Sequence, residues 1–171
     1  MSGAEELVAV YDAAGEVAGS APRSVMRAEG LWHATTSVLV RSVDGDRVYV
    51  HRRSPDKDVF AGMYDCWAGG VVSAGESPGE AAVRELAEEL GVTGVPLRPL
   101  FTLRYEGGSV RCHVYAFEVG WDGPVVHQPE EIVSGGWMTL RELRRRLADP
   151  RWPFVPDGRR CIEEWFAREA V

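Results

Sequence analysis

The apolar residues of this chain recur in short alternating runs that predict β-strands. Leu7–Tyr11 is the first such run, and the turn at Asp12–Gly15 ends it. Two β-rich runs follow between residues 31 and 53, and they are separated by Asp44-Gly45, a dipeptide typical of hairpin turns. The same pattern predicts further strands within residues 62–72, at residues 97–105 and 110–119 as a second hairpin, and from Trp137.

Four other segments carry the signals of helices. Ser20–Glu29 has Pro22 near its start and Gly30 after its end, and Ser77 and Gly91 enclose a second helix. Thr139 and Glu142 form a capping-box pattern for a helix that reaches about residue 148, and Asp157 is a candidate cap for a last helix that ends near residue 170. Strands and helices thus alternate without a repeat or a long linker, which predicts a single α/β domain over residues 1–171. Residues 1–30 form an N-terminal extension of a strand and a helix, and residues 31–171 form the core.

Composition and charge exclude several classes of function. The chain has 171 residues, 45% of them hydrophobic and 26% charged, which is typical of a folded globular protein. Its net charge of −7 opposes binding to a nucleic acid polymer, which depends on basic residues. No apolar run is long enough to span a membrane and no signal-peptide pattern starts the chain, so we expect a cytoplasmic protein without a membrane partner. The three cysteines lack metal-site spacing and are expected to be buried. The sequence does not indicate an oligomeric state.

The helix after Ser77 concentrates negative charge. Ser77, Pro78 and Glu80 fit its N-terminus, and helical spacing predicts that Val83, Leu86, Ala87 and Leu90 form its buried face. Three carboxylates, Glu85, Glu88 and Glu89, project into one region on the other side. They repel one another and oppose the helix dipole, which favours cations at this end. A solvated acidic face is one interpretation, and a site for a hard divalent cation, which selects carboxylate oxygens, is the other.

The spacing of these residues resembles the complete signature of the Nudix hydrolases. The pattern is Gly70, five residues, Glu76, seven residues, Arg84-Glu85-Leu86, one residue, Glu88-Glu89, one residue, Gly91-Val92. The resemblance implies an α/β/α sandwich around a mixed sheet, the Nudix fold, and hydrolysis of a diphosphate linkage in a nucleoside diphosphate derivative. It also implies bound Mg²⁺ or Mn²⁺, held by Glu85, Glu89, Glu88 and the carbonyl group of Gly69, with Arg84 orienting a neighbouring glutamate.

A general base is also required. Glu88 is one candidate, and the resemblance also gives it the role of a metal ligand or of a group that positions water. Glu131 is the other, because the family often brings a late glutamate back to the metal ions, although an exposed loop acid explains Glu131 equally well. The choice between them stays open.

A second resemblance, over about residues 7–92, is to the isopentenyl-diphosphate isomerase branch of the superfamily. It implies that Arg53 and Lys57, with Arg52 beside them, bind the diphosphate group of a substrate; Lys57 is the only lysine of the chain. The chain departs from the isomerases near Gly69, where it lacks their catalytic cysteine and the histidine that follows. Cys66 is displaced by three positions, and His33 is more simply a hydrogen-bonded core residue. The intact signature favours hydrolysis.

The sequence therefore predicts a metal-dependent pyrophosphohydrolase for a nucleoside di- or triphosphate. An isomerase of isopentenyl diphosphate and a non-catalytic nucleotide-binding regulator are the alternatives. The base or other moiety of the substrate is not identified, because the aromatic residues that stack bases serve equally well in a core.

Overall fold

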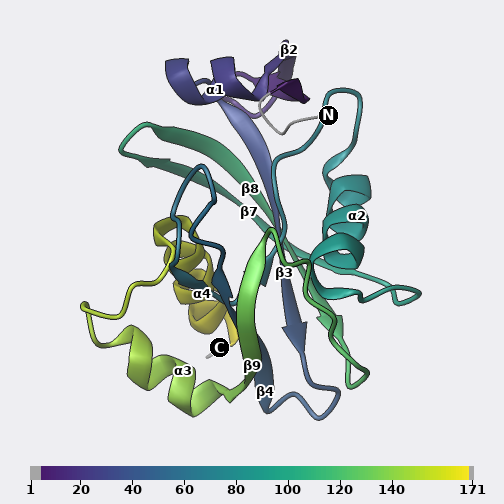
Figure 1. The fold of residues 1–171 in the computed structure, drawn as a ribbon, viewed down its shortest axis with the longest axis vertical. Helices are drawn as coiled ribbons and strands as arrows, with labels where there is room; N and C mark the ends of the chain where they lie inside the picture. The colour runs from purple at the N-terminus through teal and green to yellow at the C-terminus, as the bar shows by residue number, and fades with distance from the viewer. Residues whose placement is uncertain (1–4, 170–171) are drawn as a thin grey trace.

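A mixed β-sheet forms the centre of the molecule (Figure 1). The computed structural model describes residues 5–169. The strands are β1 (Leu7–Tyr11), β2 (Val17–Pro22), β3 (His33–Arg41), β4 (Arg47–Arg53), β5 (Tyr64–Asp65), β6 (Trp67–Ala68), β7 (Arg98–Gly107), β8 (Val110–Gly120) and β9 (Ile132–Thr139). The helices are α1 (Arg23–Glu29), α2 (Pro78–Leu90), α3 (Leu140–Leu147) and α4 (Pro156–Glu169).

Strand β3 is the centre of this sheet. It pairs in parallel with β8 from His33 to Arg41 and antiparallel with β1, β4 and β6. The β7–β8 hairpin and the antiparallel pairing of β4 with β9 extend the sheet on its two sides. The combination of parallel and antiparallel pairs confirms the prediction of a mixed sheet.

Helices cover both faces of the sheet, as the separate core clusters show. Val38 and Val40 of β3 pack with Leu86 of α2 in one cluster, whereas Leu39 packs with Ile162 of α4 in another. Successive side chains of a strand point to opposite faces, so β3 is buried on both sides. The α/β/α sandwich is therefore confirmed, with α2 on one face and α3 and α4 on the other (Figure 1).

The elements predicted from the sequence differ from the structure in three places. β2 was not predicted, and the helix expected from Ser20 begins only at Arg23, because β2 is an exposed edge strand that exists through its pairing with β1. β9 begins at Ile132 rather than Trp137, and it was missed because Ser134 and the two glycines after it interrupt the apolar alternation. Helix α4 begins at Pro156, so Asp157 lies in its first turn and does not cap it, and its predicted end at residue 170 lies outside the described residues.

Two other predictions concern the chain as a whole. Cys66, Cys112 and Cys161 are all buried and free, as expected. Within residues 5–169, no helix is long and apolar enough to cross a membrane.

Candidate active site

Helix α2 begins and ends where its sequence predicts. The side chain of Ser77 accepts a hydrogen bond from the backbone N–H of Glu80, and the Glu80 side chain accepts one from the N–H of Ser77, which completes the capping box. Gly91 ends the helix in the left-handed conformation, with φ of 67°. These two caps fix which residues of α2 face the sheet.

The buried face of α2 differs from the predicted one. Leu86 and Leu90 are buried as expected, but Val83 is 57% exposed, and the small residues Ala81 and Ala82 pack on the sheet instead. Glu89, predicted on the opposite side, is only 6% exposed and faces the protein interior. The predicted face was rotated by part of a turn from the observed one, because the prediction used only apolar residues and the observed face includes the buried Glu89.

Two glycines bring the sheet close to these carboxylates. A Cβ atom on Gly69 would lie 1.8 Å from the carbonyl oxygen of Thr36 on β3, and one on Gly70 would lie 2.7 Å from Oε1 of Glu85. The N–H of Gly69 donates to Oε2 of Glu89 at 3.3 Å. Only glycine permits this approach of backbone to side chains, so the chain after β6 holds the acidic groups of α2 in place.

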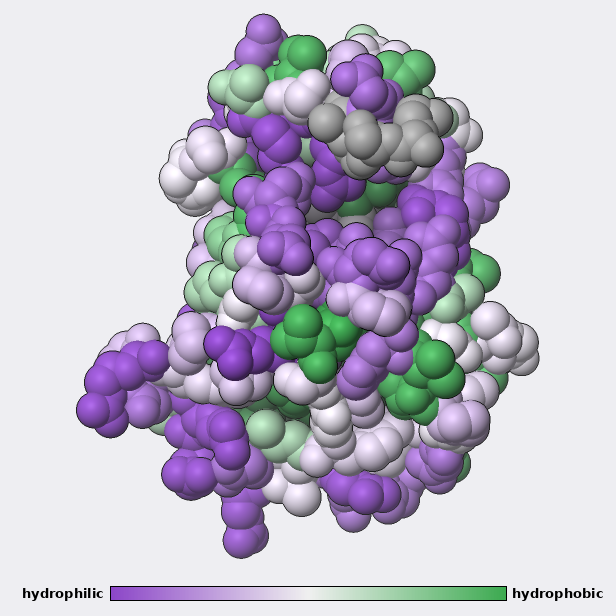
Figure 2. Space-filling view, in the orientation of Figure 1, coloured by the Kyte–Doolittle hydropathy of each residue, from purple (hydrophilic) through white to green (hydrophobic). Residues whose placement is uncertain are grey.

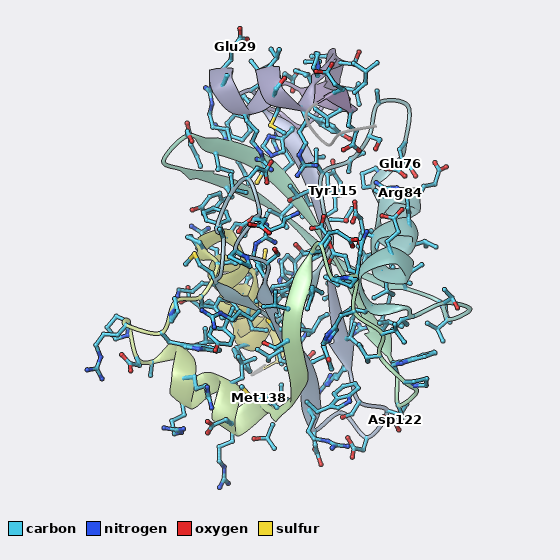
Figure 3. The ribbon with its side chains drawn as sticks, viewed as in Figure 1. Glu29, Glu76, Arg84, Tyr115, Asp122 and Met138 are labelled. Carbon is cyan, nitrogen blue, oxygen red and sulfur yellow. The ribbon has the colours of Figure 1, made fainter. Side chains whose placement is uncertain are left out.

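Arg84 connects the glutamates of the signature. Its Nε and Nη2 atoms donate to the two carboxylate oxygens of Glu76, at 2.8 and 2.9 Å, and the two residues lie together beside α2 in Figure 3. Its Nη1 atom donates to Glu85 at 2.9 Å and to Glu88 at 3.4 Å. These hydrogen bonds lower the pKa of Glu76 and raise that of Arg84. The guanidinium group thus fixes the orientation of Glu85 while it lies beside the cleft.

The charged forms of the Glu85 and Glu89 carboxyl groups are electrostatically unfavourable. Burial raises the pKa of Glu89 well above its ordinary value, and the nearby charges of Glu85 and Glu131 raise it further. Burial also raises the pKa of Glu85, although Arg84 opposes the shift. A cation in contact with both groups would remove this destabilisation of their charged forms.

Glu131 approaches the same place from the loop before β9. The N–H groups of Val126 and Gln128 donate to the last carbonyl groups of α2, those of Leu90 and Glu89, at 3.0 and 3.1 Å. The carbonyl group of Glu131 accepts from the N–H of Ser54 at 2.9 Å, and its side chain forms an ion pair with Lys57. The C-terminal end of α2 and the β4–β5 loop therefore hold Glu131 near Glu85 and Glu89.

Helix α1 contributes two arginines to the site, Arg23 and Arg27, which the sequence analysis did not predict there. Arg23 and Arg27 lie one turn apart, and both Nε atoms donate to Oδ2 of Asp58 at 3.1 Å. Their spacing of four residues was the available signal, but nothing in the sequence placed α1 near the carboxylates of α2 or against the loop that carries Asp58. Because β2 and α1 fold back beside β1, the two arginines face the acidic helix.

These parts enclose a cleft of about 730 Å³, the main cleft. Hydrophilic residues dominate this face of the molecule between α1 and α2 (Figure 2). The main cleft is lined by the acidic residues Glu85, Glu88, Glu89 and Glu131, by the basic residues Arg23, Arg27, Lys57 and Arg84, and by Gly69 and Gly70, among others.

The three predicted phosphate-binding residues occupy different places. Lys57 lines the main cleft. Arg53 instead lines a smaller cavity that opens from it, and its Nη2 atom donates to the carbonyl oxygen of Val59 at 3.2 Å. Arg52 is exposed, donates to the carbonyl oxygen of Gly62 at 2.9 Å and lies over the ring of Tyr64. Lys57 and Arg53 are thus at the site, and Arg52 points elsewhere.

The residues that an isomerase would need are not available at this site. Cys66 is buried in the core cluster beneath α4, and burial raises the pKa of its thiol well above the ordinary value. His33 is 2% exposed, contacts the carbonyl oxygen of Leu31 at 2.9 Å through Nδ1, and has a pKa lowered to about 4 by burial. Neither group is prepared to transfer a proton to a carbon atom.

Comparisons with known proteins agree with this geometry. The NUDIX domain family matches residues 31–158. An uncharacterised Nudix hydrolase of Rhodococcus erythropolis, orf19, is 50% identical, over 95% of this chain and 92% of the relative. The uncharacterised Nudix hydrolase YfcD of Escherichia coli K12 is 34% identical, over 96% of this chain and 89% of the relative.

Solved structures show the same fold. The crystal structure of the DR0079 protein of Deinococcus radiodurans has a TM-score of 0.80 and 26% identity, over 93% of this chain and 98% of that one. The Nudix domain of Shewanella oneidensis NrtR, solved in complex with ADP ribose, has a TM-score of 0.65 and 18% identity, over 80% of this chain and 88% of that one. The chain therefore belongs to the Nudix family, and it is a hydrolase that acts on pyrophosphate bonds.

Proposed function

We propose that this protein is a metal-dependent pyrophosphohydrolase that cleaves a phosphoanhydride bond of a nucleoside di- or triphosphate or of a related nucleoside diphosphate derivative. One observation supports it most strongly. The carboxylates of α2 and Glu131 form one wall of the main cleft, and Lys57 with the two arginines of α1 forms another. A polyphosphate chain with bound cations has the charges that both walls require.

The donor set fits Mg²⁺ or Mn²⁺. Glu85, Glu88 and Glu89, with the carbonyl group of Gly69, would hold the ion through oxygen atoms, the ligands that these cations prefer. Among residues 5–169, no three histidine, cysteine, aspartate or glutamate side chains are arranged so that they could hold a metal ion by themselves. Mg²⁺ usually keeps several water molecules and binds substrate phosphates directly, so these residues would supply only part of its ligands. When bound, the ion supplies charge neutralisation at the phosphate oxygens.

Phosphate binding is assigned to Lys57 and to the arginines of α1. The ammonium group of Lys57 lies beside Glu131 in the main cleft, and Arg23 and Arg27 already hold one carboxylate oxygen of Asp58 between them. Guanidinium groups that bind a carboxylate in this way also bind phosphate oxygens. Arg52 has no part in this proposal, because it contacts Gly62 and Tyr64 away from the main cleft.

Glu88 and Glu131 remain the two candidates for the general base, and the surroundings of each support the assignment. The Glu88 side chain is 48% exposed and accepts from Arg84 at 3.4 Å, so it is hydrated and can take a proton from water in the main cleft. Glu131 faces the same space and is paired with Lys57. Comparing the pH dependence of turnover in Glu88→Gln and Glu131→Gln identifies the base, since the variant that lacks it loses the acidic limb of the rate profile.

A hydrolysis screen tests the proposed function. Nucleoside di- and triphosphates, ADP ribose and isopentenyl diphosphate are incubated with the protein, with Mg²⁺, Mn²⁺ or a chelator. We expect phosphate, pyrophosphate or a nucleoside monophosphate to be released only with metal. Formation of dimethylallyl diphosphate would favour the isomerase instead, and tight nucleotide binding without any turnover would favour a regulator.

A further inference from the structure

A second cavity, the side pocket, opens from the main cleft. Its volume is about 80 Å³, and Arg23, Arg27, Lys57, Gly69 and Gly70 line both spaces, so the two adjoin each other. A molecule whose phosphates lie in the main cleft can therefore extend into the side pocket. The residues that line the side pocket but not the main cleft include the ionisable residues Arg53, Asp65, Asp157 and His33, the polar residues Thr35, Thr36 and Ser37, and the apolar residues Trp67, Val71 and Val155.

Three ionisable groups that line the side pocket, those of Arg53, Asp65 and Asp157, form no ion pair with one another. Asp65 is 7% exposed, and its Oδ1 atom accepts from the N–H of Trp67 at 3.1 Å. Asp157 accepts from the N–H of Gly158 at 3.0 Å. The charge of Arg53 acts on both carboxyl groups, yet its buried Nε atom has no hydrogen-bond partner among residues 5–169. Buried polar groups without partners are rare in native proteins, so the site is equipped for hydrogen bonds that the chain itself does not provide.

Two aromatic side chains, Trp67 and Phe60, line the side pocket among mostly polar residues. Trp67 is fixed by a hydrogen bond from its Nε1 atom to the carbonyl oxygen of Gly158 at 3.1 Å. Phe60, from the loop between β4 and β5, also lines the pocket and has φ of 53°, a left-handed conformation that is unfavourable for a bulky residue. Strain of this kind persists where the surrounding structure requires a particular side-chain position.

We propose that the side pocket binds the edge of an amino-bearing nucleobase, whose amino group donates to Asp65 and Asp157 while an adjacent ring nitrogen or carbonyl oxygen accepts from Arg53. This inference rests on the proposed function, because the phosphates of the same molecule occupy the main cleft. It identifies the substrate class by the donors and acceptors that its base presents.

Other ligand groups match the side pocket less well. An apolar group would leave the buried Arg53 Nε atom without a partner and would displace water from the two carboxyl groups, which is costly. An anion would meet two carboxyl groups, and an aliphatic ammonium ion would satisfy them but face the guanidinium group of Arg53. A planar heterocycle with a donor beside an acceptor satisfies both signs of charge and packs against the aromatic side chains.

Asp65 and Asp157 also lie at the N-terminal end of α4, where acidic groups stabilise a helix. A Cβ atom on Gly158 would lie 2.6 Å from Oδ1 of Asp65, so the helix approaches this carboxyl closely. Burial nevertheless raises the pKa of Asp65 to about 8 and also raises the pKa of Asp157. The helix end thus does not compensate for their burial, and a purely structural role would not produce any discrimination between bases.

Matched nucleotides test the inference directly. Cytidine and uridine nucleotides differ by an amino group in place of a carbonyl oxygen, and so do adenosine and inosine nucleotides. Dissociation constants for the four monophosphates are measured by calorimetry, which needs no turnover, and kcat/KM is measured for the four diphosphates. We expect the amino-bearing member of a pair to be favoured about 10- to 100-fold, the size of effect that an unpaired buried polar group produces.

Asp65→Asn and Asp157→Asn should reduce this preference towards equality, while Glu163→Gln on the exposed side of α4 should keep it. Circular dichroism identifies a variant that does not fold, and the second aspartate variant then provides the test. Equal binding of amino and oxo nucleotides by the wild-type protein, or a preference unchanged in a folded aspartate variant, would overturn the inference even if hydrolysis occurs. A preference in binding without any hydrolysis would support the side pocket and contradict the proposed function.

Discussion

Helices α2 and α3 both carry dense charge, but their charged residues have different environments. On α3, Arg145 is 71% exposed, and Glu142 accepts hydrogen bonds from Arg145 and Arg146 at the surface. On α2, Glu89 is 6% exposed and Glu85 is held between Arg84 and Gly70. The excess positive charge of α3 is at the surface, whereas the excess negative charge of α2 lies inside a cleft. Charge density alone therefore does not identify a site, and unbalanced buried charge is the informative feature.

Replacement of the most buried carboxylate should have the largest effect. We expect Glu89→Gln to reduce kcat at least about 100-fold, because the amide has the same shape but cannot hold a cation or balance its charge. Its melting temperature should equal or exceed that of the wild type, since the buried carboxyl is unfavourably charged. Steady-state turnover and thermal unfolding measure the two effects, with Glu163→Gln on α4 as the matched control. A folded Glu89→Gln variant with normal turnover would remove the distinction between α2 and α3.

The orienting role of Arg84 should give the next largest effect. Arg84→Lys keeps the positive charge but loses the two parallel hydrogen bonds to Glu76 at 2.8 and 2.9 Å. We expect turnover to fall about 10- to 100-fold and the Mg²⁺ concentration for half-maximal activity to rise, as when a group that orients a metal ligand is removed. Titration of activity with Mg²⁺ measures both. Unchanged metal dependence would mean that Glu85 keeps its position without the guanidinium group.

Lys57 should affect substrate binding more than turnover. We expect Lys57→Met to raise KM about 10-fold, the effect of losing one charge-assisted contact to phosphate, with a smaller change in kcat. Initial rates over a range of nucleotide concentrations separate the two parameters, and Arg52→Met is the control because Arg52 points away from the main cleft. Equal effects of the two variants would contradict the placement of phosphates beside Lys57.

The charges of α3 should have the smallest effect, limited to stability. Hydrogen bonds from Arg145 and Arg146 lower the pKa of Glu142 to about 2. Because this pKa is lower in the folded than in the unfolded protein, the stabilisation exists above about pH 4.3 and is lost as the pH falls towards 2. Glu142→Gln should therefore melt slightly below the wild type at pH 7, and the difference should shrink by pH 2.5. Turnover should not change, and a loss of activity in this variant would mean that α3 has a role beyond the surface.

Local sequence signals predicted α2 well and the surroundings of the site poorly. The capping box at Ser77 and the terminator Gly91 depend on neighbouring residues, so they were recognised directly. Arg23 and Arg27 reach the main cleft only because β2, an exposed strand without apolar alternation, pairs with β1. That pairing is a tertiary effect with no local signature.

The side pocket illustrates the same limit. Asp65 belongs to a two-residue strand and Asp157 to the first turn of α4, so neither stands in a motif. Their proximity depends on the packing of α4 against β5, which periodicity does not specify. The signature predicted the chemistry of the enzyme because its residues are close in sequence, and the parts that select a substrate come from distant segments.

The attachment of the β8–β9 connection to the end of α2 has a consequence for how this family can diversify. Residues 121–125 precede the first backbone contact with the helix, whereas residues 126–131 are tied to it at Val126 and Gln128. Insertions in the first stretch should leave Glu131 in register, but gain or loss of a single residue in the second would displace it. Evolution and engineering can therefore vary loop length on one side of Val126 and only side-chain identity on the other.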